Sequence, residues 1–175
     1  MQVLPRKSHR NDTARRRILE PIELDSPLYG GREPMLGALH AYWHAKSTGR
    51  TMPSRIDLDM VEMPRAALPY LMLIDVVRTG PAWRYRYRYR LVGTEMVSVI
   101  GRDVTSLFLD EVIPAERHAD VFDWLDAVVR DRIPMALEMS LGWENRDFRH
   151  ARRVALPLSA DGTNVDMMLC AFALS

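Results

Sequence analysis

The chain has 175 residues but only one cysteine, Cys170, and it contains no long apolar run. A single cysteine excludes an internal disulfide and is typical of a reducing compartment. No apolar segment approaches the roughly 20 residues that a membrane-spanning helix needs. The basic N-terminus is not followed by the apolar stretch of a secretory signal. We therefore expect a cytoplasmic protein that does not bind a membrane.

The sequence motifs of common enzymes are also absent. There is no glycine-rich phosphate loop, no Cys-x-x-Cys pair, no nucleophile elbow and no His-Glu-x-x-His zinc motif. Carboxylates are plentiful, but their spacing is typical of solvated helix faces. The formal net charge is +1, so charge alone predicts neither nucleic acid nor a membrane as a partner. We predict that the protein is not an enzyme.

Residues 1–32 differ in composition from the rest of the chain. They are polar, contain three prolines and carry six lysines or arginines between positions 6 and 17. We predict a flexible basic tail, followed by a folded domain with an N-terminal flanking helix over residues 33–175. Two alternatives remain open. The tail contacts nucleic acid or an acidic partner, or its apolar residues over 18–24 lie against the domain.

The segment 83–91 alternates between two kinds of side chain. Its aromatic and apolar positions share one parity and are Trp83, Tyr85, Tyr87, Tyr89 and Leu91. Its cationic positions share the other parity and are Arg84, Arg86, Arg88 and Arg90. Because successive side chains of a strand point to opposite faces, the pattern predicts a strand with an aromatic face and a cationic face.

The cationic face has two interpretations. The arginines pair with local carboxylates on an exposed surface, or they form an anion-binding strip for nucleic acid or for an acidic partner. The tyrosines of the same strand point to the other face, where they cannot stack on bases. This weakens the nucleic-acid hypothesis.

Hydrophobic spacing predicts the remaining elements. A helix over 33–47 has an apolar face made of Leu36, Leu39, Tyr42 and Trp43. Further helices are predicted over 95–100, 105–112 and 115–131, and strands over 71–77, 135–141, 148–158 and 165–174. His40 and His44 are spaced i, i+4, but no third ligand is evident nearby, so we predict no metal site.

Several short motifs resemble a PAS-like family that is common in alphaproteobacteria. They are Tyr89-Arg90-Leu91-Val92-Gly93-Thr94, Gly101-Arg102-Asp103-Val104-Thr105, Tyr42-Trp43, Pro53-Ser54-Arg55 and Leu68-Pro69. The predicted order of strand, strand, helices and three strands is also that of a PAS domain. The resemblance covers about residues 33–175. The family usually has glycine where this chain has Ser106, so we expect a more relaxed turn there.

The resemblance implies an α+β PAS fold. Five antiparallel strands would lie in the order 2-1-5-4-3, with central helices on one face and the helix 33–47 flanking the other. The two strands expected at the centre, 71–77 and 165–174, are apolar on both parities, as doubly covered strands are. PAS domains often dimerise through a flanking helix, so we predict a homodimer in which Leu36, Leu39, Tyr42 and Trp43 take part.

The resemblance also places a cavity between the sheet and the central helices. The candidate lining residues are Tyr87, Tyr89, Leu91, Met96, Ile100, Phe108, Val121, Phe122, Leu125 and Met139. The alternative is that these residues form only a core.

No cofactor can be assigned to this cavity from the sequence. The photoreactive flavin subclass needs a cysteine on a central helix, whereas Cys170 lies in the last strand. Haem needs an axial ligand, and His118 lies among charged residues, as a surface histidine would. We therefore expect neither flavin nor haem.

The sequence thus predicts a non-catalytic sensory or regulatory PAS module of bacterial signal transduction, which binds a small ligand, a signalling protein or both. One alternative is a module that binds nucleic acid or an acidic partner through its arginines and its basic tail. Another is an enzyme on the same fold, because a fold alone does not fix a function.

Overall fold

The computed structural model describes residues 17–18, 33–80, 85–139 and 151–174, and for residues 17, 18, 138 and 139 it describes the backbone alone. The strands are β1 (Arg17–Ile18), β2 (Leu71–Val77), β3 (Arg86–Val92), β4 (Met135–Met139), β5 (Ala151–Leu158) and β6 (Met167–Leu174). The α-helices are α1 (Pro34–Ser47), α2 (Thr94–Ile100), α3 (Leu109–Val112) and α4 (His118–Asp131). Three 3-10 turns are η1 (Arg55–Asp57), η2 (Leu68–Tyr70) and η3 (Ala115–Arg117).

The strands form one antiparallel sheet in the order β1-β4-β5-β6-β2-β3. Its five longer strands have the predicted PAS order, 2-1-5-4-3, so the α+β PAS fold is confirmed. The first and last of these five, β2 and β6, lie at the centre of the sheet. Their side chains are buried at almost every position, because layers of structure cover both faces of the sheet.

A two-residue strand adds to the sheet outside β4. Arg17 and Ile18 of β1 pair with Glu138 and Leu137 of β4. The strand predicted over 135–141 is therefore not an edge strand, as the five-stranded scheme implied. Part of the predicted flexible tail lies on the sheet, where β1 supplies the hydrogen-bonding partner that an edge strand lacks.

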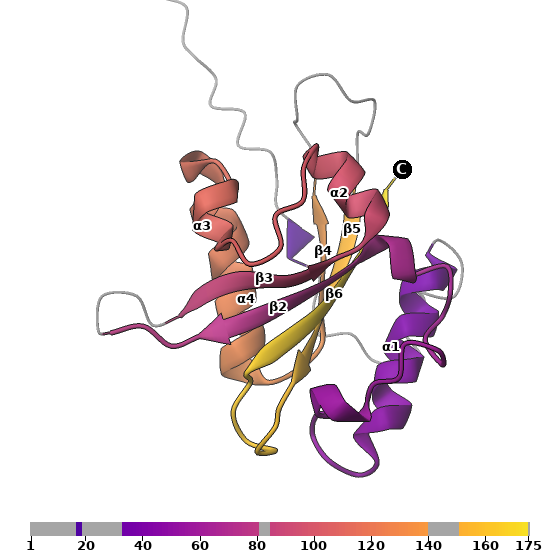
Figure 1. Ribbon diagram of the computed structural model, residues 1–175. Helices are drawn as coiled ribbons and strands as arrows, with labels where there is room; N and C mark the ends of the chain where they lie inside the picture. The colour runs from indigo at the N-terminus through magenta and orange to yellow at the C-terminus, as the bar shows by residue number, and fades with distance from the viewer. Residues whose placement is uncertain (1–16, 19–32, 81–84, 140–150, 175) are drawn as a thin grey trace, which may run out of the picture.

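The two faces of the sheet are covered by different helices (Figure 1). The predicted flanking helix, α1, packs on one face, and α2, α3 and α4 lie on the other. Leu36, Leu39 and Trp43 of α1 are buried in the core. The indole Nε1 of Trp43 donates a hydrogen bond of 2.9 Å to the carbonyl oxygen of Pro157 in β5. Helix α1 is therefore bound to the sheet by both apolar packing and a buried hydrogen bond.

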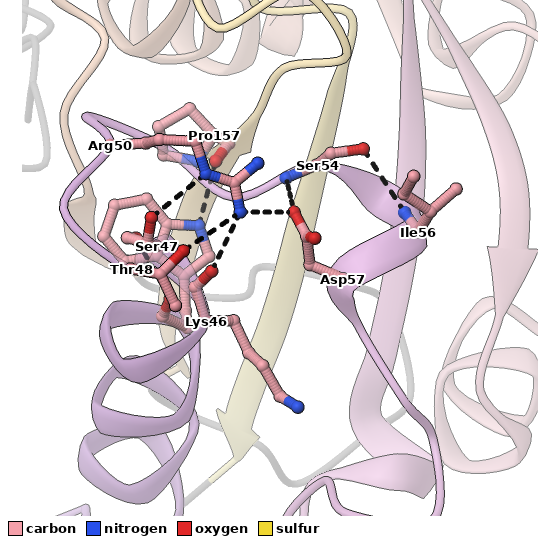
Figure 2. Close-up of polar contacts among 9 residues, drawn as sticks. Lys46, Ser47, Thr48, Arg50, Ser54, Ile56, Asp57 and Pro157 are labelled. Carbon is pink, nitrogen blue, oxygen red and sulfur yellow. Dashed lines mark hydrogen bonds and ion pairs between the residues drawn. The ribbon is translucent and has the colours of Figure 1, made fainter.

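Polar contacts fix the chain where it leaves α1 (Figure 2). The guanidinium of Arg50 donates from Nε to the carbonyl of Ser47 at 3.1 Å and from Nη2 to the carboxylate of Asp57 at 2.7 Å. The same carboxylate oxygen accepts a 2.7 Å hydrogen bond from the backbone N–H of Ser54. These bonds tie the C-terminal end of α1 to the turn η1 that follows it.

An irregularity in β3 changes the face on which its side chains lie. The register with β2 shifts between Leu73 and Ile74, so that Tyr89 is opposite Ile74 and Leu91 is opposite Leu73. One extra residue, Arg90, is accommodated between them, which is the property of a β-bulge. The alternation that puts Tyr87 and Tyr89 on one face therefore does not extend to Leu91.

Gly93 joins β3 to α2 at a point of close approach between two backbones. A Cβ atom at this position would lie 2.3 Å from the carbonyl oxygen of Pro69 and 2.6 Å from its carbonyl carbon. The N–H of Gly93 also donates a hydrogen bond of 2.7 Å to the carbonyl of Leu71. Only glycine fits here, which gives a physical reason for the glycine in the motif 89–94.

The loop before α3 covers the outer edge of β3. Tyr89 donates its N–H to the carbonyl of Leu107 at 2.9 Å, and its carbonyl accepts from the N–H of Ser106 at 2.7 Å. Because this loop pairs with β3, the helix predicted over 105–112 is confined to Leu109–Val112. The relaxed turn expected at Ser106 is not found, since its φ is +74°, in the left-handed region that favours glycine.

Candidate functional site

A cavity of about 90 Å³ lies between the sheet and the helices α2, α3 and α4. Most of its lining side chains are apolar, and they come from the central strands β2 and β6 as well as from the helices. Five of the predicted pocket residues line it, namely Tyr89, Met96, Ile100, Val121 and Leu125. A concave site of this kind, lined by apolar side chains with a few polar groups, is typical of small-molecule binding.

Two predicted residues line a different hollow. Tyr87 and Phe122 belong to a depression of about 970 Å³ between β3 and the helices α3 and α4. Their rings are stacked with centroids 6.0 Å apart, and the Tyr87 hydroxyl donates a hydrogen bond to the carboxylate of Asp126. Several side chains that line this depression are solvent-exposed, including Asp110 and Asp123. Its lining is more polar than that of the cavity between the sheet and α2–α4, and the two share no lining residue.

Two further predictions for the pocket are wrong. Leu91 does not line the cavity, because the bulge in β3 places it opposite Leu73 and not beside the cavity-lining Ile74. Phe108 does not line it either. The Phe108 ring lies under the guanidinium of Arg86, with the Cζ atom 3.7 Å from the ring centroid. The side chain of Met139 lies outside the described residues.

The polar residues of the cavity come from three strands, from the turn η3 and from α4. Arg153 of β5 is only 5% exposed, and its Cζ atom lies 4.1 Å from the centre of the Trp124 ring of α4. Tyr89 and Cys170 line the cavity from β3 and β6. Arg117, half-buried in η3, lies on the same cavity.

Burial keeps the titratable groups of the cavity protonated. Desolvation raises the pKa of the Cys170 thiol to about 12, although the positive charge of Arg153 acts in the opposite direction. Burial also raises the pKa of the Tyr89 phenol well above its usual value, again against the effect of Arg153. At neutral pH the cavity therefore contains an O–H donor, a neutral thiol and a buried cation.

Sequence reasoning missed Arg153 and Trp124. In the strand predicted over 148–158, the apolar positions 154, 156 and 158 share one parity, and an interior face chosen from them alone leaves Arg153 facing outward. The burial of Arg153 could have been inferred from the sequence, because both faces of the sheet were predicted to be covered by other elements. If both faces are covered, the opposite parity is buried as well, and an arginine there needs a special environment. Trp124 supplies part of that environment by stacking on the guanidinium.

The arginine row has local partners. The buried carboxylate of Asp75, in β2, lies 2.9 Å from Nη2 of Arg88 and 3.6 Å from Nη1 of Arg90. Arg86 contacts the carboxylate of Asp110 at 2.9 Å and that of Glu111 at 3.8 Å.

These pairs are the arrangement that the first interpretation of the cationic face predicted. Each of the three described arginines has its charge opposed by a nearby carboxylate, which reduces the attraction for an external anion. Arg84 lies outside the described residues. Asp75 was not singled out from the sequence, although it is the one charged residue of an otherwise apolar strand.

The histidines that the sequence singled out have structural contacts. His40 is buried and stacks on Trp43, and its burial, together with the nearby His44, lowers its pKa. His118 is half-buried, and its Nε2 atom lies 2.7 Å from the carbonyl oxygen of Ile113. Within the described part of the chain, no group of three or more His, Cys, Asp or Glu side chains is placed to hold a metal ion.

The chain belongs to the PAS domain family, because a family model described as PAS domain matches residues 32–173. PAS domains are generally sensory and regulatory modules that carry no catalytic activity of their own. No curated protein and no solved structure matches the chain. Among the described residues, no helix has the length and apolar character that a membrane crossing requires.

Proposed function

We propose that this PAS domain is a non-catalytic cytoplasmic sensor that binds a small molecule in the cavity between its sheet and α2–α4. The observation that supports the proposal most directly is the position of this cavity. It is lined by central strands of the sheet and by α2, α3, η3 and α4, so a ligand would contact both layers of the domain. Occupation of the cavity would therefore change how the helices pack on the sheet.

A protein partner or a second copy of the chain would then receive the signal. The predicted dimer contacts need revision, because Leu36, Leu39 and Trp43 are buried against this domain's own sheet. Tyr42 is half-buried, and its hydroxyl bonds both the N–H and the carbonyl of Asp59. A dimer through α1 would use the exposed outer side of the helix, where Ala41 lies.

The oligomeric state tests this part of the proposal. Sedimentation of the wild-type chain is expected to show a dimer, and Ala41→Glu, which places a charge on the outer side of α1, is expected to shift it toward monomer. The matched control is Ala160→Glu in the exposed loop between β5 and β6. A wild-type chain that is monomeric at all concentrations would exclude the dimer.

The alternative, in which the arginines of β3 bind nucleic acid or an acidic partner, has less support. Its three described arginines already lie beside Asp75, Asp110 and Glu111. A generic oligonucleotide at low and high salt provides the test. Binding that weakens steeply with salt would favour the alternative over the ligand sensor.

The ligand proposal is tested by native mass spectrometry of the chain recovered from a cell lysate, together with an absorbance scan of the purified protein. The wild-type chain is expected to carry a small molecule that is released on denaturation. Cys170→Leu, which fills part of the cavity from β6, is expected to lose it while keeping a folded domain. If neither the lysate nor a panel of metabolites gives a bound species or a higher Tm, the sensor proposal is wrong.

A further inference from the structure

We propose that the cavity between the sheet and α2–α4 binds a small, uncharged, hydrocarbon-like molecule of about four to six carbon atoms. This inference rests on the proposed function and adds the chemical class of the ligand. It follows from the chemistry of the cavity wall, from the position of its charged groups and from its size.

The wall of the cavity consists mainly of carbon and sulfur. Strand β2 contributes Met72 and Ile74 to it, and α2 contributes Met96, Val99 and Ile100. Among the described residues, no aspartate or glutamate lines the cavity. A ligand with hydrocarbon surface would remove apolar area from water both on itself and on this wall, which is favourable in proportion to the area removed.

The polar atoms of several lining residues are covered by the domain itself. The indole Nε1 of Trp124 and the Nε and Nη2 atoms of Arg153 have almost no accessible surface, so they cannot donate a hydrogen bond to a ligand in the cavity. The Cys170 thiol is a weak donor, and burial keeps it neutral by raising its pKa to about 12. A polar ligand would therefore lose its hydrogen bonds to water and gain few in return.

The charged groups of the cavity also disfavour a charged ligand. A cation would lie near Arg117 and Arg153 with no carboxylate of the described lining to oppose them. An anion could not reach the covered nitrogen atoms of Arg153, and Arg117 is half-buried, so that solvent screens its charge. Because a charge that enters an apolar site without close partners loses much free energy of hydration, the ligand is uncharged.

The size of the cavity limits the number of carbon atoms. Its volume is about 90 Å³, whereas an engineered apolar cavity of about 150 Å³ binds benzene. The cavity is partly open, because Ile113 is half-buried and Pro114 is exposed where they line it between α3 and η3. A ligand can enter from this side, and the flexible side chains of Met72 and Met96 can adjust to its shape.

Four probes test the proposal on the wild-type chain. They are benzene, phenol, benzoate and mesitylene, titrated calorimetrically at constant pH and ionic strength. Benzene is expected to bind at least about fivefold more tightly than phenol, because the hydroxyl group would leave water without a good partner. Benzoate is expected not to bind. Mesitylene is expected to bind more weakly than benzene, because its three methyl groups exceed the cavity.

Variants locate the site on the structure. Cys170→Leu extends a side chain into the cavity and is expected to abolish benzene binding. Ala171→Leu is the matched control, because Ala171 is the next residue of β6, is fully buried and does not line the cavity. It is expected to keep the wild-type affinity for benzene.

A third variant tests the size limit. Met96→Ala removes part of the wall and is expected to reduce or reverse the preference for benzene over mesitylene. Met63→Ala is its control, since Met63 is equally buried and does not line the cavity. Circular dichroism of each variant checks the fold, and the wild-type titrations stand without them.

The outcomes separate this inference from the proposed function. Phenol or benzoate that binds as tightly as benzene would overturn the assignment of an apolar ligand and leave a ligand-binding sensor in place. Benzene binding that Cys170→Leu leaves unchanged would also overturn it. If none of the probes binds, the ligand class is wrong, and the lysate experiment described above decides separately whether the sensor proposal is wrong as well.

Discussion

The two faces of the sheet are covered in different ways. On one face, α1 contributes Leu36, Leu39 and Trp43 to a closed core, and polar bonds hold its C-terminal end to the following turn (Figure 2). On the other face, α2 and α4 cover the sheet but leave a cavity of about 90 Å³ that contains a buried arginine. Both covers are helical, and both rest on the same central strands.

The difference indicates that the two sides of the sheet have different roles. A tightly packed core transmits strain and resists change, whereas a cavity leaves contacts that a ligand can complete. We expect the α1 side to supply stability, and under the proposed function the α2–α4 side would respond to a ligand. The comparison can be tested by making matched changes on the two sides.

Truncation of a buried side chain should cost more on the α1 side. Leu39→Ala is expected to lower the free energy of unfolding by about 4 kcal/mol, toward the upper part of the range for buried leucines. Met96→Ala, which is equally buried but borders the cavity, is expected to cost only about 2 kcal/mol, because part of its surroundings is already empty. Urea unfolding at constant pH measures both. Equal losses would mean that the two sides are packed alike.

The junction before α2 is on the cavity side, but a substitution there is expected to destabilise the domain strongly. Gly93→Ala is expected to destabilise the domain by about 3 kcal/mol, because its Cβ would lie 2.3 Å from the carbonyl oxygen of Pro69 and the backbone would have to move. Gly80→Ala is the control, since a Cβ there meets nothing within 4 Å. Denaturant midpoints of the two variants measure the difference. Similar midpoints would show that the junction is not tightly packed.

Enlarging two neighbouring residues of β6 compares the faces directly. Ala171→Leu extends a fully buried side chain that does not line the cavity, and overpacking there is expected to cost about 1–3 kcal/mol. Cys170→Leu extends into the cavity and is expected to cost less than about 1 kcal/mol. Thermal unfolding of both variants checks this order. A larger loss for Cys170→Leu would contradict the presence of usable space beside it.

The smallest effect is expected at Ser106. Its φ of +74° costs a residue with a side chain more than it costs glycine, so Ser106→Gly should relieve strain. Glycine also gains entropy in the unfolded chain, which offsets part of the gain. The net stabilisation is expected to be less than about 1 kcal/mol. A loss of stability in chemical denaturation would mean that the Ser106 side chain contributes contacts that outweigh the strain.

Much of this arrangement is predictable from side-chain patterns. The strands 71–77 and 165–174 are apolar on both parities, and both lie at the centre of the sheet. The face of Leu36, Leu39 and Trp43 packs on the sheet as its helical spacing indicates. These features are predictable because burial acts on each residue through its own hydrophobicity and its place in a regular repeat.

The missed features depend on pairing between segments that are distant in sequence. Leu91 was assigned to the cavity because alternation was extended through Arg90, and only the register with β2 shows the bulge. Phe108 was assigned to a helix, whereas its loop pairs with β3. Arg153 was overlooked because its parity was taken as exposed. In each case a local pattern was overridden by a tertiary contact.

The measurement that tests the account most directly is an NMR titration of the chain with a panel of small apolar metabolites, after labelling its methionine methyl groups with carbon-13. Met72 and Met96 line the cavity, whereas the equally buried Met52 and Met63 do not. The account predicts saturable shifts of the Met72 and Met96 signals and no change for Met52 and Met63. Shifts of similar size at all four methyl groups, or at none, would contradict a binding cavity under α2–α4.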